Sequence, residues 1–217
     1  MGKTLAIVGD NGAGKSTLVK LLCRFYDPTD GRVLLNDQDV RSLRQEDVHR
    51  RLSVYFQMPL YYNMTVADNI AVAEREEAVD LDRVKEASYL AGATEIINRL
   101  PQGYDTVLGV WFGPGTDLSV GEWQRIALAR ALFRQASVFV LDEPTSAMDP
   151  WAEAEWIRRF RAFAVGKTSI IITHRFTTAM VADIICVMEG GAIVEMGSHT
   201  ELLAQDGRYA QSWREFS

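Results

Sequence analysis

Residues 9–17 have the composition and order of a loop that binds phosphate groups. Glycines allow successive backbone N–H groups to point inward at phosphate oxygens. Lys15 would reach the β- and γ-phosphates of a nucleotide, and the Ser16 hydroxyl would bind Mg²⁺. The alternative is a glycine-rich turn with an accidental lysine. The candidate phosphate-binding residues are Gly9, Asp10, Asn11, Gly12, Ala13, Gly14, Lys15, Ser16 and Thr17.

The segments on either side of this loop predict the elements that hold it. Residues 5–8 form a short apolar run, which indicates a buried strand. Leu18, Leu21, Leu22 and Phe25 follow at helical spacing and predict an amphipathic helix. A strand, a glycine-rich loop and a helix in this order are the context in which G-x-x-x-x-G-K-S/T is a P-loop, so we expect a nucleoside triphosphate site.

Two carboxylates, Asp142 and Glu143, close a second apolar run at residues 138–141. A continuous apolar run predicts a strand buried on both faces, and carboxylates at its end need a positive partner. In a P-loop fold the first carboxylate holds the Mg²⁺ shell and the second polarises water. The alternative is a solvated carboxylate pair at a strand end.

Gln57 and His174 each follow a predicted strand, at residues 52–56 and 168–172. A glutamine amide there suits Mg²⁺ or an attacking water, and a neutral imidazole suits a γ-phosphate oxygen and a catalytic carboxylate. Taken alone, a glutamine before a loop is usually only a polar residue at a strand end, and the histidine is explained about equally well as a structural residue.

Ser119 and Glu122 have the spacing of a helix capping box. The same geometry, a helix N-terminus with a hydroxyl and glycine N–H groups, also binds phosphate. Because the P-loop already has its own helix N-terminus, a second one becomes useful when it serves the nucleotide of another chain.

Composition places these motifs in an ordinary globular chain. The 217 residues suffice for one α/β domain with an inserted subdomain, and the net charge of −6 argues against a broad nucleic-acid surface. The two cysteines, Cys23 and Cys186, stand among apolar residues, so we expect buried reduced thiols; the alternative is a disulfide, which a cytosol-like compartment does not require. Histidine and cysteine spacing predicts no metal cluster. No apolar run approaches a membrane span, so we expect a chain that is soluble on its own.

Periodicity predicts the remaining elements. We expect strands at 32–36, 184–188 and 193–196, a polar turn at 37–39 and a short helix at 43–51. Between residues 59 and 135 the pattern predicts a helical insertion with an acidic stretch at 74–82 and a loop at 103–117. Further helices are expected at 65–70, 81–91, 94–100, 119–134, 149–165, 176–182 and 200–216.

The order of these motifs resembles that of an ATP-binding cassette (ABC) ATPase, across essentially the whole chain. The P-loop, Gln57, the segment 118–122, Asp142–Glu143, Asp149 and His174 occur in the family's order. Residues 24–31 and 65–70 resemble exporter-type subunits in particular. The resemblance implies the nucleotide-binding domain of an ABC transporter. Its fold would be a P-loop NTPase core at 1–58 and 136–217, with a mostly parallel sheet flanked by helices and a helical subdomain inserted at 59–135.

The resemblance also implies a role for each site residue. Residues 9–17 would be the Walker A motif and Asp142 the Walker B aspartate, with Ser16, Gln57 and Asp142 around Mg²⁺. Glu143 would be the general base, assisted by His174 as the switch histidine and Gln57 as the Q-loop residue. Asp149 would be the D-loop aspartate. The signature that completes the opposite protomer's site would be Leu118, Ser119, Val120, Gly121 and Glu122.

Such domains bind two ATP molecules in a head-to-tail dimer and drive export through transmembrane domains. The partners implied are therefore a second nucleotide-binding domain, identical or different, and fused or separate transmembrane domains. They would hold the chain at the cytoplasmic face of a membrane, with contacts after Gln57 and around 106–113. Two other classes remain: a soluble ABC-type ATPase of DNA repair or translation, which usually has coiled-coil arms or a basic surface, and a slow or non-hydrolysing nucleotide switch.

Two features depart from the family pattern. The signature Leu-Ser-Gly-Gly-Gln is Leu-Ser-Val-Gly-Glu here. The glutamate preserves the capping box, so we expect it to be tolerated, whereas β-branched Val120 stands where the backbone should approach phosphate and predicts slower hydrolysis. The family also has two strands and an adenine-stacking aromatic residue before the P-loop strand. We therefore expect a fragment of a longer polypeptide, with the N-terminal antiparallel β part truncated, or an incomplete adenine site.

Overall fold

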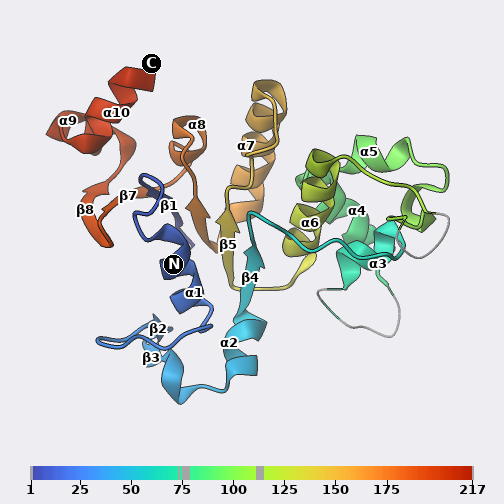
Figure 1. Ribbon diagram of the computed structural model, residues 1–217, viewed down its shortest axis with the longest axis horizontal. Helices are drawn as coiled ribbons and strands as arrows, with labels where there is room; N and C mark the ends of the chain where they lie inside the picture. The colour runs from blue at the N-terminus through green and yellow to red at the C-terminus, as the bar shows by residue number, and fades with distance from the viewer. Residues whose placement is uncertain (1, 73, 75–78, 111–114, 217) are drawn as a thin grey trace. The chain divides into compact units, whose positions relative to one another are not determined.

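The strand before the P-loop, β1 (Thr4–Val8), lies inside a six-stranded sheet among the residues that the structure describes, in the order β4-β5-β6-β1-β7-β8. The computed structural model describes residues 2–72, 74, 79–110 and 115–216 (Figure 1). β1 runs parallel to both neighbours, with Leu5 opposite Ile170 and Ile184. β5 is also parallel to β6, and β7–β8 is an antiparallel hairpin. The mostly parallel sheet with flanking helices confirms the predicted fold class.

The chain divides into two units, each described here by itself. The first consists of Met1–Val54, Ala136–Glu143 and Ala164–Ser217, and the second of Tyr55–Gln135 and Pro144–Phe163. The elements of the first unit are β1, α1 (Lys15–Leu22), β2 (Leu34–Leu35), β3 (Gln38–Asp39), η1 (Val40–Ser42), α2 (Gln45–Arg51), β4 (Leu52–Tyr55, whose last residue falls in the second unit), β5 (Val138–Asp142), β6 (Thr168–Ile172), α8 (Phe176–Ala179), β7 (Ile184–Glu189), β8 (Ala192–Gly197), α9 (His199–Gln205) and α10 (Arg208–Phe216).

The second unit is helical. Its elements are α3 (Val66–Ala71), α4 (Leu81–Leu90), α5 (Thr94–Asn98), η2 (Gly103–Asp105), α6 (Val120–Phe133) and α7 (Pro150–Ala164, whose last residue falls in the first unit). Buried α6 residues such as Ile126 and Leu128 form part of its core. The expected acidic stretch at 74–82 and loop at 103–117 lie partly outside the described residues. The predicted limits of the helical insertion, 59–135, stay a prediction.

Alternation along β1 explains how the first unit covers both faces of its sheet. Ile7 packs in one cluster with Val19 of α1 and with Cys23, the residue that caps the end of that helix. Ala6 and Val8, which point to the other face, pack in a second cluster with Leu202 of α9 and Tyr209 of α10. The central strand β1 is therefore buried on both faces, as its apolar run predicts.

Three local predictions need correction. Residues 32–36 do not form a full strand. Asn36 and Asp37, at φ 51° and 63°, make a left-handed turn that joins β2 to β3, so the polar segment 37–39 contains a strand. The first helix ends at Leu22, which leaves Phe25 beyond it and 49% exposed. Asp206, left-handed at φ 52°, separates the C-terminal segment into α9 and α10.

Both cysteines are free and buried, as expected. No helix within the described ranges is long and apolar enough to cross a membrane. The same residues contain no cluster of three or more acidic, histidine or cysteine side chains that could hold a metal ion.

Candidate functional site

The P-loop occupies the predicted turn between β1 and α1. Gly14 takes φ 102° and caps α1 without a side-chain hydrogen bond, so no side chain at that position blocks the helix N-terminus. At Gly9 a Cβ would stand 2.3 Å from the carbonyl oxygen of Met188, so only glycine allows this close approach of β1 and β7. Lys15 Nζ donates to the carbonyl oxygens of Gly9, at 2.6 Å, and Asp10, at 2.9 Å. The lysine thus lies folded over the loop whose phosphates it would bind.

Glu143 and His174 lie beside each other at the edge where the parallel strands end. Asp142 is paired with Ile172 across β5 and β6, and Glu143 continues this register because its N–H donates to the Ile172 carbonyl oxygen at 2.9 Å. Glu143 Oε1 accepts a hydrogen bond from the His174 N–H at 3.1 Å and lies 2.7 Å from His174 Nδ1. Since a carboxylate only accepts, Nδ1 carries the proton of this hydrogen bond and Nε2 is left for another ligand.

Glu143 is buried although it is polar. Its side chain is 8% exposed, whereas that of His174 is 66% exposed. Glu143 Oε2 has no hydrogen-bond partner among the described residues. The residue also takes φ 54°, a conformation that costs energy outside glycine and is found mainly at functional sites. A buried carboxylate oxygen with one free acceptor is suited to bind and polarise a water molecule.

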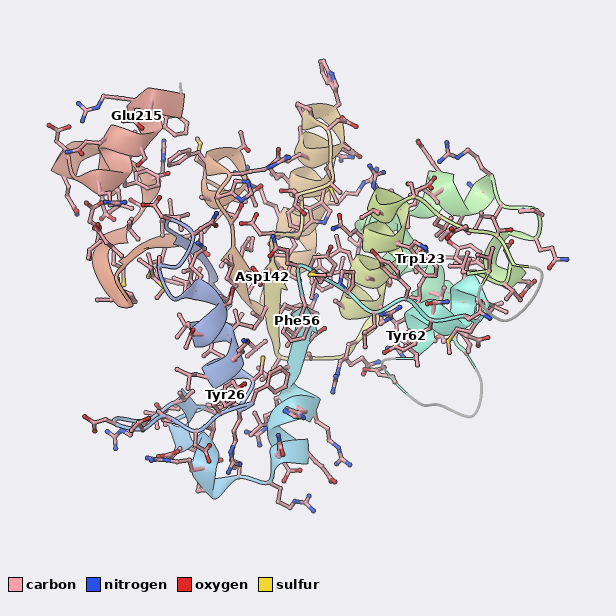
Figure 2. The ribbon with its side chains drawn as sticks, in the orientation of Figure 1. Tyr26, Phe56, Tyr62, Trp123, Asp142 and Glu215 are labelled. Carbon is pink, nitrogen blue, oxygen red and sulfur yellow. The ribbon has the colours of Figure 1, made fainter. Side chains whose placement is uncertain are left out.

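Asp142 ends β5 next to this pair and is labelled in Figure 2. Burial raises the pKa of Asp142 above its ordinary value, the neighbouring Glu143 charge raises it further, and Lys15 acts in the opposite direction. Burial and the adjacent Glu143 charge thus both disfavour the ionised form of Asp142, and a cation bound at this carboxylate would favour that form. Together with the Ser16 hydroxyl this gives an all-oxygen donor set that fits Mg²⁺, which takes one or two carboxylates and completes its shell with phosphates and water.

Ser119 begins α6 in the second unit with the predicted capping box. Its Oγ accepts from the Glu122 N–H at 3.4 Å, and Glu122 Oε2 accepts from the Ser119 N–H at 2.9 Å. The hydrogen bond from the Ser119 N–H holds the pKa of Glu122 below its ordinary value. Val120 is the first helical residue, is absent from the positive-φ residues, and is 66% exposed. Its backbone is therefore unstrained, and any effect on hydrolysis must come from the exposed isopropyl group.

Asp149 and Gln57 also belong to the second unit. Asp149 Oδ1 accepts from the N–H groups of Ala152 and Trp151, each at 2.9 Å, so it caps α7, and these bonds lower its pKa. Gln57 is exposed and follows β4 by two residues. Within the first unit the structure thus brings together residues 9–17, Asp142, Glu143 and His174. Gln57, Asp149 and residues 118–122 lie in the other unit, and their roles stay predictions.

One charged neighbour of the P-loop was not predicted. Arg208 Nη2, on α10, donates to Asp10 Oδ2 across 198 residues of sequence. No local pattern reveals such a contact, because it depends on how the C-terminal helices fold back on the sheet.

Comparisons with known proteins show which family the chain resembles. A family model described as "ABC transporter" matches residues 1–146. The chain is 46% identical over 209 residues to an "ATP-dependent lipid A-core flippase" of Chromohalobacter salexigens, covering 96% of this chain and 35% of that protein. It is 40% identical over 211 residues to "Multidrug resistance protein homolog 65" of Drosophila melanogaster, covering 97% and 16%.

A solved structure gives the same result for the fold. The "Structure of a bacterial Atm1-family ABC exporter with ATP bound" superimposes with a TM-score of 0.90 at 40% identity. The match covers 100% of this chain and 37% of that one. The chain therefore spans about a third of the length of the flippase and the exporter that it resembles.

Proposed function

The chain belongs to the ABC transporter family, and from that premise we propose that it is the ATP-hydrolysing domain of an exporter. The observation that carries the proposal is the Glu143–His174 pair at the strand edge that also bears the P-loop. The similarity to a flippase and to an ABC exporter supports a transport role.

In this proposal Lys15 and the N–H groups at the start of α1 bind the ATP phosphates. Lys15 already lies over the loop and exchanges its two carbonyl partners for phosphate oxygens. Ser16 and Asp142 would hold Mg²⁺ together with the nucleotide phosphates, and Gln57 would contribute its amide oxygen. Bound Mg²⁺ neutralises phosphate charge.

Glu143 is the general base of the proposed reaction. Its unpartnered Oε2 accepts a proton from the attacking water, while Oε1 stays hydrogen-bonded to His174. His174 thereby fixes the carboxylate and presents Nε2 to the γ-phosphate. If Nε2 also donates to phosphate, the ring must be an imidazolium, because Nδ1 already donates to Glu143.

The site is completed in a head-to-tail dimer, in which the Ser119 helix start of one chain covers the P-loop of another. Transmembrane domains are the second proposed partner, and they would place the chain at a membrane surface. Three exposed apolar side chains in the regions expected to meet them support this surface: Met58 at 88%, Leu60 at 68% and Val110 at 55% exposed.

The proposal is tested by ATP binding and phosphate release with Lys15→Ala. Loss of a hydrogen bond to a charged group costs about 1.5–3 kcal/mol, so we expect the Kd for Mg-ATP to rise roughly ten- to hundredfold. Lys20→Ala is the matched control, because Lys20 is an exposed lysine in the last turn of the same helix. Equal affinities in the two variants would contradict the proposed site, whereas wild-type binding without phosphate release would favour the nucleotide switch.

A further inference from the structure

Asp10 places a negative charge in a loop that must bind an anion. It follows Gly9 directly, and its side chain is 78% exposed. Glu189, at the end of β7, is a second exposed carboxylate that shares a cationic partner with it. Left alone, these two charges would oppose the approach of nucleotide phosphates, because like charges repel over a distance of about 10 Å at ordinary salt.

Arg208 joins both carboxylates. Its Nη2 donates to Asp10 Oδ2, and its Nη1 donates to Glu189 Oε1 at 2.8 Å. Two nitrogens of one planar guanidinium therefore hold a P-loop residue and the end of a sheet strand in a fixed relation.

The start of α10 is itself anchored, so Arg208 is presented in one position. Glu195, on β8, accepts hydrogen bonds from the N–H groups of Arg208 and Tyr209, the second at 3.0 Å. A Cβ on Gly207 would stand 2.2 Å from Glu195 Oε1, so a larger residue there would require the Glu195 carboxylate to shift. The Tyr209 side chain is 1% exposed and packs edge-on against Phe176.

The hairpin that carries Glu189 and Glu195 also contacts the P-loop. The Gly191 N–H donates to the Ala13 carbonyl oxygen at 3.0 Å, and the loop between β1 and α1 lies beside β7–β8 in Figure 1. The P-loop, the hairpin and α10 therefore form one continuous set of contacts within the first unit.

We propose that Arg208 is a positioning residue for the phosphate-binding loop, which holds Asp10 and cancels its charge so that the loop accepts nucleotide phosphates. The proposal rests on the proposed ATP site. An exposed ion pair adds little to stability, so the effect of Arg208 is on anion affinity rather than on folding. It also links the C-terminal helices to nucleotide binding.

The test compares Arg208→Gln with Arg214→Gln in the 217-residue chain. Arg214 is on the same helix and pairs with Asp206 at 2.6 Å, so its variant removes an equivalent surface ion pair away from the P-loop. We expect Arg208→Gln to raise the Kd and the KM for Mg-ATP about three- to tenfold at low salt, with kcat unchanged and a smaller effect at high salt. Arg208→Lys should recover most of the affinity, because it retains the charge.

The charge mechanism is tested in an Asp10→Asn background. There the removal of Arg208 should weaken binding much less than in the wild type, because Asp10 no longer carries a charge and Glu189 is the one carboxylate of the two that is left to neutralise. An unchanged penalty in that background would overturn the proposal, since the effect would then run through Glu189 or the fold. Equal affinities of Arg208→Gln and Arg214→Gln for Mg-ATP would also overturn the proposal. If the wild type still binds Mg-ATP in that case, the proposed ATP site itself stands. Absence of ATP binding by the wild type would instead refute the proposed function.

Discussion

Glu143 combines three properties that rarely occur in one residue: a left-handed backbone, a buried carboxylate, and one unpartnered oxygen among the described residues. Sequence reasoning could identify the residue, because two carboxylates at the end of an apolar strand are unusual. It could not identify the strained φ or the bond to His174 Nδ1, since both depend on the register of β5 with β6. The structure thus assigns each oxygen of Glu143 a separate task in the proposed reaction.

Val120→Gly tests the effect of the altered signature at the residue scale. The isopropyl group is exposed at the helix start that would face another chain's phosphates, so its removal should increase the single-turnover ATPase rate. We expect a two- to tenfold gain, which corresponds to at most about 1.4 kcal/mol in the barrier. The glycine also lowers helix propensity by up to about 1 kcal/mol. The rate is therefore measured at saturating ATP, so that a change in ATP affinity does not enter the comparison.

Val165→Gly is the control for this substitution, since Val165 is 79% exposed and lies outside every proposed site. The control should leave the rate unchanged. A Val120→Gly rate equal to that of the wild type would remove the argument that this side chain slows hydrolysis.

Cys23 predicts a pH dependence of stability. Burial raises the pKa of its thiol from 9.0 to about 11, so between these values the folded chain binds more protons than the unfolded chain. Stability must therefore fall as pH rises through this range. Urea unfolding at pH 8 and pH 10 measures the effect, and Cys23→Ala should reduce the loss. Tyr209, whose pKa burial raises to about 12, contributes at higher pH in both proteins, so an equal loss in the two would contradict the assignment to Cys23.

At the scale of elements, parallel strands position the site because their C-terminal ends meet at one edge of the sheet. β1 leads into the P-loop, β5 into Glu143, and β6 into His174. The strands were predictable because each contains a run of three or more consecutive apolar residues. We therefore expect the packing of β5 in the core to contribute strongly to the stability of the sheet that carries these residues.

Leu141→Ala tests that dependence. Leu141 is 0% exposed in β5, so the substitution leaves a cavity and should lower the free energy of unfolding by about 2–5 kcal/mol. Ile193→Ala, on β8 and 54% exposed, should cost less than about 1 kcal/mol. Urea unfolding of the two variants measures the difference. Similar losses would mean that burial in β5 does not govern stability.

The elements that were missed are those formed by turns rather than by apolar periodicity. Asn36 and Asp37 both adopt left-handed conformations, which moved the hairpin turn ahead of the predicted polar segment. Asp206 and Gly207 carried a turn signal that could have predicted the break between α9 and α10. In each case two turn-forming residues set the direction of the chain, and the spacing of apolar residues does not reveal them.

For the whole molecule, the predicted site residues are distributed over both units. The P-loop, Asp142, Glu143 and His174 belong to the first unit, whereas Gln57, Asp149 and the Ser119 helix start belong to the second. Motif order could predict the list of residues but not a contact such as Arg208 with Asp10, which joins positions 198 residues apart. The proposed dimer explains why one chain carries two helix N-termini suited to phosphate.

The central claim is that two chains enclose ATP and that Glu143 is the general base for its hydrolysis. Size-exclusion chromatography with light scattering of Glu143→Gln, with and without Mg-ATP, tests this most directly. The account predicts the 24.3 kDa monomer without nucleotide and twice that mass with Mg-ATP. The variant should still bind ATP, but its side-chain amide cannot accept the proton from water, so the ATP-bound dimer accumulates. A variant that binds ATP and remains at 24.3 kDa would contradict it.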